Sequence, residues 1–393
     1  MSEQIALTGN EALALAMKQI NPDVVAAYPI TPQTEVVQLF SQFVADGVVD
    51  TEFVTVESEH SAMSATVGAS AGGARAMTAT SANGLALMWE IVYIAASTRL
   101  PIVMPVVNRA LSGPINIHCD HSDAMGARDS GWLQLFGENA QAAYDNVIQA
   151  LRIAEHRDVM LPVMVNMDGF IISHAVENIK PLADQDIRDF IGEYQPAYSL
   201  LDPDQTTTYG PLDLQDFYFE HKRQQVDGLE HALEVVLDIG REFYQLTGRD
   251  YGYFEKYRLD DAEIALIGLA STMGTAREAV NNLRKEGIKA GLINLRLFRP
   301  FPVQALREAL QDIKVLGVMD RADTFSLNGG PLFGEIRNTL FDFGNKLKIV
   351  NYIYGLGGRD INLSDMEGIF RQLLEVKENG KVKQLVNYYG VRE

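Results

Sequence analysis

The sequence predicts an α/β protein with a mostly parallel sheet in each of two domains. Three observations lead to this prediction. Short apolar runs rich in Val, Ile and Tyr alternate with segments of helical periodicity, and the spacing suits βαβ units rather than an all-β or all-α fold. Polar residues gather directly after the predicted strands, where parallel sheets form their sites. The 393 residues, 47% of them hydrophobic, suffice for two or three full-sized cores.

The first domain is expected to cover residues 1–250. Residues 1–17 resemble a capped amphipathic helix and not a signal peptide, because no basic segment precedes an apolar one. The strands are then expected at 24–28, 52–56, 74–80, 102–107 and 159–166, and the helices at 32–43, 60–72, 84–97 and 139–156. A polar segment at 110–132 interrupts this alternation, and loops of that length inside a compact domain are usually functional.

Residues 196–225 have no steady period and are interpreted as an arm, followed by a helix at 226–246 that ends at Gly248. The second domain, residues 251–393, is a further α/β block, with the boundary expected near 250–257. Its strands are expected at 263–269, 289–297, 315–319 and 348–354, and its helices at 275–286, 302–312, 333–343 and 364–376.

Composition excludes several classes of function. With 33 basic and 52 acidic residues the net charge is −19, which repels nucleic acid and anionic membranes. The longest apolar runs, such as 100–107, are far shorter than the ~20 residues that span a bilayer. The single cysteine, Cys119, excludes an internal disulfide and cannot hold an iron–sulfur cluster, so a cytoplasmic chain whose redox centres lie elsewhere is expected.

Four polar residues mark the predicted carboxyl edge of the first sheet. They are Thr31, Glu59, Asn83 and Arg109. Pro29 and Pro32 fix the backbone on both sides of Thr31, and Arg109 can direct two hydrogen bonds onto a carboxylate or phosphate. The alternatives are that Thr31, Glu59 and Asn83 only cap helices, and that Arg109 forms an ordinary ion pair.

Other motifs are weaker. His118, Cys119 and His121 lie close to Asp120 and Asp123, but the spacing matches no standard zinc pattern, and no metal site is predicted. The Gly-rich segment 355–360 follows a strand yet lacks the G-x-G-x-x-G spacing, so a stand-alone dinucleotide-binding protein is disfavoured. Residues 328–331 could seat an anion or form a simple turn.

Several motifs, in the same order, resemble those of the alpha subunit of the 2-oxoacid:ferredoxin oxidoreductase family, most closely its pyruvate:ferredoxin oxidoreductase branch. The resemblance runs from about residue 9 to 170 and resumes from 253 to 330. It rests on Tyr28-Pro29-Ile30-Thr31-Pro32, Val56-Glu57-Ser58-Glu59-His60, Asn108-Arg109-Ala110-Leu111-Ser112, Asp120-His121-Ser122-Asp123 and Gly268-Leu269-Ala270-Ser271-Thr272-Met273-Gly274.

This resemblance implies a thiamine diphosphate enzyme divided among chains. The present chain would supply the pyrimidine-binding domain and a second domain like the C-terminal domain of transketolases. A beta subunit would hold the diphosphate and Mg²⁺, and gamma and delta-type subunits would include the carrier of the 4Fe–4S clusters. Coenzyme A, ferredoxin and a dimer of heteromers are also implied. The sequence agrees with this division, because it lacks the Gly-Asp-Gly motif with a later Asn that holds Mg-diphosphate in thiamine enzymes.

The resemblance also implies roles for individual residues. Glu59 matches the glutamate that bonds the pyrimidine nitrogen of the cofactor, with Pro29 and Asn83 on the cofactor side. Thr31 and Arg109 match the residues that bind the 2-oxoacid. Asn83 stands where relatives commonly carry Gln, and His118 where they often carry an aromatic residue, so both roles stay open. Pyruvate is the expected substrate, with 2-oxobutyrate, 2-oxoisovalerate and 2-oxoglutarate as alternatives. A non-catalytic scaffold subunit is the alternative to an enzyme.

Overall fold

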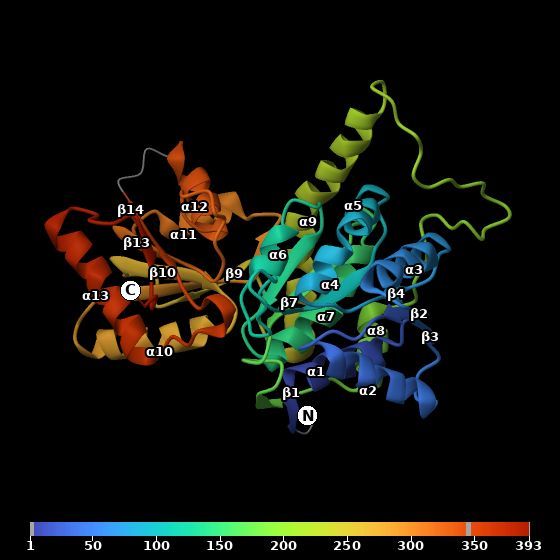
Figure 1. Cartoon of the computed structure of the whole chain (residues 1–393), viewed down its shortest axis with the longest axis horizontal. Coiled ribbons are helices and arrows are strands. Elements are labelled where there is room, and N and C mark those ends of the chain that lie inside the picture. The colour runs from blue at the N-terminus through green and yellow to red at the C-terminus, as the bar shows by residue number, and fades with distance from the viewer. Residues whose placement is uncertain (1–3, 343–346, 393) are drawn as a thin grey trace.

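The computed structural model describes residues 4–342 and 347–392, which form two large sheets and one small one (Figure 1). In the seven-stranded sheet one edge strand, Leu297–Arg299, is antiparallel and all other neighbours are parallel, and in the six-stranded sheet only one edge strand is antiparallel. Helices cover both. The predicted α/β class with mostly parallel sheets is therefore confirmed.

The first sheet has the order β12-β6-β7-β5-β4-β2-β3. Its strands are β2 (Val24–Ala27), β3 (Glu52–Thr55), β4 (Ala76–Met77), β5 (Val103–Asn108), β6 (Leu133–Gly137), β7 (Val163–Asp168) and β12 (Leu297–Arg299). The predicted strand at 74–80 is only two residues long, although Thr80 adds a bridge to Val106 of β5. Strand β6, which follows the polar loop, was not predicted. The order places the carboxyl ends of β2, β4 and β5 next to one another.

Helices follow the strands of this part along the chain, after loops of different lengths. They are α1 (Gly9–Ile20), α2 (Thr34–Ala45), α3 (Glu59–Ala71), α4 (Ala82–Leu87), α5 (Trp89–Ser97), α6 (Ser122–Gly126) and α7 (Ala140–Glu155). The predicted helix 84–97 is thus two helices. Helix α1 has a capping box formed by Thr8 and Glu11. It packs on α7 through apolar side chains such as Leu13 and Ile148.

The expectation of a helix over residues 1–17 is wrong for its start. Residues 1–3 lie outside the described residues, and Ile5–Thr8 form β1, which pairs antiparallel with β8 (Val176–Ile179). Strand β1 has only four residues. Four residues are too few to distinguish the two-residue period of a strand from the period of a helix.

Residues 192–217 form neither helix nor strand, and they follow α8 (Asp184–Ile191). Helix α9 (Tyr218–Thr247) begins eight residues earlier than predicted, so the expected arm at 196–225 includes its first two turns. The later half of α9 is buried against the first domain through Val236, Ile239 and Phe243. Figure 1 shows the N-terminal end of α9 projecting from the rest of the molecule, and the segment before it running as a long loop without helix or strand.

The second sheet has the order β15-β14-β13-β10-β11-β9. Its strands are β9 (Phe254–Tyr257), β10 (Ile264–Leu269), β11 (Ala290–Leu295), β13 (Val315–Asp320), β14 (Lys348–Ile353) and β15 (Val386–Tyr388), with the helices α10 (Thr272–Lys285), α11 (Val303–Leu310), α12 (Pro331–Phe341) and α13 (Leu363–Asn379) and a 3-10 turn at Leu356–Gly358. The strand expected at 289–297 is β11, after which the chain crosses to the first sheet as β12. Phe343, the expected end of α12, lies outside the described residues.

No helix in residues 4–342 and 347–392 is long and apolar enough to cross a membrane.

Candidate active site

The substrate-binding pair predicted from the sequence lies together at the carboxyl edge of the first sheet. Arg109 follows β5, and its Nη1 donates to the backbone oxygen of Thr31 at 2.8 Å, while its Nε donates to the backbone oxygen of Asn116 at 3.0 Å. Arg109 is 7% exposed, whereas Thr31 is exposed. Within the described residues no carboxylate pairs with Arg109, so the ordinary ion pair considered from the sequence is not present.

Glu59 is the first residue of α3, and it is only 8% exposed. Across the described part of the chain, no donor bonds its carboxylate and no basic group pairs with it. The carboxylate oxygens of Glu59 are not among the fully buried polar atoms without a partner, so they remain accessible. They are therefore free to form a hydrogen bond with a ligand group.

The helix-cap alternative is wrong for all three residues to which it was applied. The N-caps of α2, α3 and α4 are Gln33, Ser58 and Ser81. Thr31 lies outside α2, and Asn83 is already the second residue of α4. The side-chain oxygen of Asn83 instead accepts from the backbone N–H of Ser112 at 3.1 Å. These side chains are thus not consumed by local helix formation.

Gly84 packs directly against the side chains of Glu59 and Thr80. A Cβ at this position would lie 2.5 Å from Oγ1 of Thr80, 2.9 Å from Cγ of Glu59 and 3.0 Å from its Oε1. The absence of a side chain is what lets α4 approach α3 this closely. The hydroxyl of Thr80 is buried and has no hydrogen-bond partner within the described residues. Sequence reasoning missed Thr80 and Gly84, although both belong to the polar strand end 80–84.

Two predicted positions are less connected to the others. Pro29 is exposed after β2 and makes no hydrogen bond to the other candidates within the described chain. His118 lies with its ring 5.1 Å from that of Phe170, and its N–H donates to the side chain of Asn116. The Gly-rich turn at 355–358 packs onto this loop, since a Cβ at Gly358 would lie 2.4 Å from the Cβ of His118. That packing gives the Gly-rich motif a structural role.

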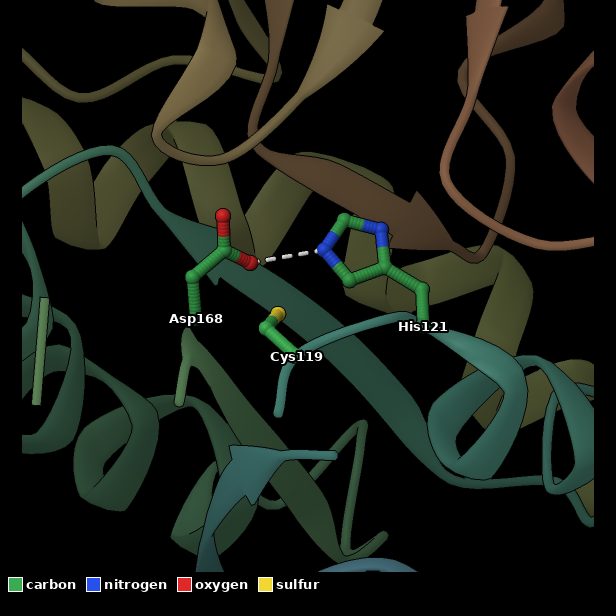
Figure 2. Close-up of side chains that lie close together, drawn as sticks. All are labelled: Cys119, His121 and Asp168. Atoms are coloured by element: carbon green, nitrogen blue, oxygen red, sulfur yellow. Dashed lines mark hydrogen bonds and ion pairs between the residues drawn. The ribbon is translucent and has the colours of Figure 1, made fainter. Parts of the chain in front are cut away.

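One group of side chains has the composition of a metal site, and it differs from the cluster considered in the sequence. Cys119, His121 and Asp168 are all buried and their possible ligand atoms lie within 4.8 Å of one another (Figure 2). Nε2 of His121 lies 2.7 Å from Asp168, whose other oxygen accepts from Arg321 at 2.8 Å. Nη1 of Arg321 also lies 3.9 Å from the sulfur of Cys119. The guanidinium of Arg321 thus already places a positive charge beside this cluster. The expectation that the chain has no metal site stays a prediction.

This buried cluster joins the two domains. Asp168 ends β7, whereas Arg321 follows β13 and Ser271 caps α10, and Ser271 also bonds Asp168 through its N–H and hydroxyl. Burial alone would raise the pKa of Asp168, but the charges of His121 and Arg321, with the hydrogen bonds from His121 and Ser271, hold this pKa well below its usual range. Asp168 therefore stays ionised.

Solved structures show the class of fold. A 2-oxoglutarate:ferredoxin oxidoreductase from Magnetococcus marinus, solved with 2-oxoglutarate, coenzyme A and succinyl-CoA bound, superposes with a TM-score of 0.73 at 22% identity, covering 95% of this chain and 66% of that one. A split-gene transketolase, in an inactive beta4 tetramer, gives 0.56 at 14% identity, covering 94% and 99%. The chain thus has the two-part α/β fold of these enzymes.

More particularly, the chain belongs to the pyruvate flavodoxin/ferredoxin oxidoreductase family. The model of that family's thiamine diphosphate-binding domain matches residues 15–240, and the model of pyruvate:ferredoxin oxidoreductase core domain II matches residues 262–366. Curated relatives cover the whole length. Pyruvate synthase subunit PorA of Thermotoga maritima is 55% identical over 100% of this chain and 99% of the relative, and its counterpart in Methanocaldococcus jannaschii is 45% identical over 96% and 97%. The resemblance seen in the sequence is confirmed, and the chain is part of an oxidoreductase.

The residues present fit a thiamine pyrimidine. The ring needs a carboxylate for one nitrogen and a flat, side-chain-free wall. Glu59 offers an unpartnered carboxylate, Gly84 adds no side chain beside it, and the orphaned hydroxyl of Thr80 lies next to both. Nothing comparable fits the diphosphate, because the Gly-Asp-Gly motif is absent from the sequence.

Proposed function

We propose that this chain is the alpha subunit of a pyruvate:ferredoxin oxidoreductase (pyruvate synthase), which converts pyruvate and coenzyme A to acetyl-CoA and CO₂ with reduction of ferredoxin, or runs in reverse. The observation that carries the proposal is the unpartnered, nearly buried carboxylate of Glu59 beside Gly84. The names of the full-length PorA relatives support the choice of reaction.

Glu59 would hold the pyrimidine end of thiamine diphosphate. When bound, that cofactor supplies the carbon nucleophile and the electron sink for decarboxylation of a 2-oxoacid. The carboxyl group of Glu59 would keep a proton at the ring nitrogen it faces, which is the general acid–base role that this chain contributes. Asn83 and Pro29 would line the same side of the cofactor, a role that their exposure permits.

Arg109 and Thr31 would bind the carboxylate and keto group of pyruvate. Nη1 and Nε of Arg109 already donate to two backbone oxygens, which fix the plane of the guanidinium. Nη2 has no partner within the described residues and can direct a charged hydrogen bond to a carboxylate. The exposed hydroxyl of Thr31 lies on the loop that Arg109 holds.

The site requires other chains. We propose a beta subunit that supplies the diphosphate and Mg²⁺ site, gamma and delta-type subunits that include the carrier of the 4Fe–4S clusters, ferredoxin as electron acceptor, and assembly as a dimer of heteromers in the cytoplasm. The lone, buried Cys119 supports the placement of the clusters elsewhere. We also propose the division into domains at 1–250 and 251–393, with residues 196–225 as an arm of the first.

The test is Glu59→Gln in the assembled complex, with Glu52→Gln on β3, an exposed carboxylate nearby, as the matched control. Glu59→Gln should reduce pyruvate-dependent reduction of ferredoxin at least 100-fold, because an amide cannot hold the proton in the same way. Cofactor content, measured on the same samples, separates loss of binding from loss of chemistry. Near-normal turnover of Glu59→Gln would refute the assignment and favour a non-catalytic scaffold subunit.

A second substrate has its own support. The ketoisovalerate oxidoreductase subunit VorA of Pyrococcus abyssi is 42% identical over 98% of this chain and 97% of the relative. Comparison of kcat/KM for pyruvate, 2-oxoisovalerate, 2-oxobutyrate and 2-oxoglutarate decides among these acids. We expect pyruvate to give the highest value, and a higher value for another acid would move the assignment to that substrate without changing the site.

A further inference from the structure

The carboxylate of Asp123 collects four hydrogen bonds directly behind the proposed site. Its Oδ1 accepts from Nδ2 of Asn108 at 3.0 Å and from the N–H of Ala124 at 2.7 Å. Its Oδ2 accepts from the N–H of Arg109 and the N–H of Ala82, both at 3.0 Å. Asp123 is 2% exposed and has no basic partner within the described residues. A buried carboxylate that is satisfied by donors from three separate segments orders those segments relative to one another.

Two of these segments carry proposed site residues. Arg109 is the residue expected to bind the 2-oxoacid, and Asp123 holds its backbone at the end of β5. Ala82 directly precedes Asn83 and Gly84, and Gly84 packs against Glu59. The carboxylate of Asp123 therefore bonds both the substrate side and the cofactor side of the proposed site.

The turn at Ala82 needs such a partner. Ala82 has φ of 41°, in the left-handed region that a residue with a Cβ adopts only when its surroundings hold it there. The N-cap residue Ser81 makes no side-chain cap bond, and its buried hydroxyl has no partner. Asp123 supplies from a distance the acceptor that a capping side chain would otherwise provide to the start of α4.

We propose that Asp123 is a positioning residue, which fixes the spacing between Arg109 and the Ala82–Gly84 turn and so keeps the substrate-binding arginine aligned with the Glu59 pocket. This inference rests on the proposed function. An amide at this position keeps one acceptor oxygen but turns an NH₂ group toward two of the N–H donors. The side chain in Asp123→Asn is thus nearly the same size as the original one, but it loses two of the four hydrogen bonds.

The experiment is a double-mutant cycle in the assembled complex, with Asp123→Asn, Arg109→Ala and the double variant compared by kcat/KM for pyruvate. Asp123→Asn alone should lower kcat/KM about 10-fold, mainly through KM, because the arginine is displaced. In the Arg109→Ala background the same change should cost less than twofold. Equal losses in both backgrounds would show that Asp123 acts only on general stability and would overturn the proposal.

Two controls complete the design. Asp129→Asn, an exposed acid six residues further along, should leave kcat/KM within twofold. If Asp123→Asn does not assemble, Asn108→Ala removes one donor to the same carboxylate and enters the same cycle, where additive losses would again overturn the proposal. Failure of the proposed function is distinguishable, since Arg109→Ala alone would then leave kcat/KM for pyruvate unchanged.

Discussion

Arg109 has the only buried guanidinium at the candidate site that is fixed by backbone oxygens and faces no carboxylate within the described residues. Arg109→Ala should lower kcat/KM for pyruvate about 10- to 100-fold, because a hydrogen bond to a charged group contributes about 1.5–3 kcal/mol. The measurement is steady-state kinetics of the assembled complex over a range of pyruvate concentrations.

Arg109→Lys is the control for charge. It keeps the positive charge but loses the fork, and it should recover only part of the lost kcat/KM. A change of less than twofold for Arg109→Ala, under ~0.5 kcal/mol of transition-state stabilisation, would show that this arginine does not bind the substrate carboxylate.

Asp320 provides a pH prediction at the level of one residue. Burial raises the pKa of Asp320 to about 7, even though the N–H groups of Leu332 and Phe333 and the side chain of Asn351 bond its carboxylate. An acid whose pKa is raised by folding stabilises the folded state at low pH. That contribution is complete below the unfolded pKa near 4 and is lost as the pH rises to about 7. Its upper bound is about 4 kcal/mol.

Thermal unfolding of the wild type and of Asp320→Asn, measured from pH 4 to about pH 9, checks this prediction. The amide does not titrate, so the difference between the two midpoints should change by several degrees between pH 4 and pH 7 and stay constant above pH 8. A difference that is independent of pH would mean that Asp320 ionises near its ordinary pKa.

At the scale of elements, the contact between α3 and α4 depends on Gly84. Gly84→Ala places a Cβ against Thr80 and Glu59, so we expect weaker binding of thiamine diphosphate and a fall in kcat/KM of about 5- to 100-fold, as overpacking of about 1–3 kcal/mol predicts. Gly68→Ala is the matched control. Gly68 lies within α3 with open space at its Cβ position, and alanine there should stabilise the helix by about 1 kcal/mol. Equal cofactor affinity in the two variants would contradict the proposed pocket.

Helices and strands that bury a continuous apolar face could be predicted from the sequence. Short strands that form only by pairing with a distant strand could not. Strands β2, β5, β10, β13 and β14 and helices α7 and α10 are near their expected ranges, because each buries a continuous face. Strands β1, β8, β9, β12 and β15 have three or four residues each and exist only through pairing with a neighbour distant in sequence. Helix α9 extends beyond its prediction because its first turns are exposed and show no apolar stripe.

Some residues of the candidate site could likewise be predicted from the sequence, and others could not. Thr31, Glu59, Asn83 and Arg109 could be proposed because the carboxyl ends of parallel strands converge, a rule that needs only the order of elements. Thr80, Gly84 and Asp123 could not, since their importance lies in distances between separate segments. From the sequence Asp123 was considered as a possible metal ligand and as part of a family motif, and the structure assigns its oxygens to four N–H donors.

At the scale of the whole molecule, three contacts join the second domain to the first. Strand β12 joins the first sheet beside β6. The side chain of Asn116, whose backbone oxygen holds Arg109, donates to the backbone oxygen of Gly357 at 3.0 Å. The buried ion pair of Asp168 and Arg321 lies beneath this loop. Movement of the second domain would therefore displace Asn116, which fixes the side chain of Arg109.

The ion pair gives a prediction for the association of the two domains. Asp168→Asn leaves the guanidinium of Arg321 buried without its counter-charge, which should destabilise the protein by about 3–5 kcal/mol. The double variant Asp168→Asn with Arg321→Met removes the uncompensated charge and should recover most of that loss.

Cys119 provides the measurement, because it is the only cysteine and lies inside this junction. Burial raises the pKa of its thiol well above the ordinary value, with further contribution from the charge of Asp168, so the reactive thiolate is scarce while the domains are packed together. Alkylation of Cys119 should be slow in the wild type, at least 10-fold faster in Asp168→Asn, and slow again in the double variant, while labelling after denaturation is equal in all three. Equal rates in the native proteins would show that the junction opens independently of this ion pair, and that the stability of the domain contact lies in β12 and the apolar cores instead.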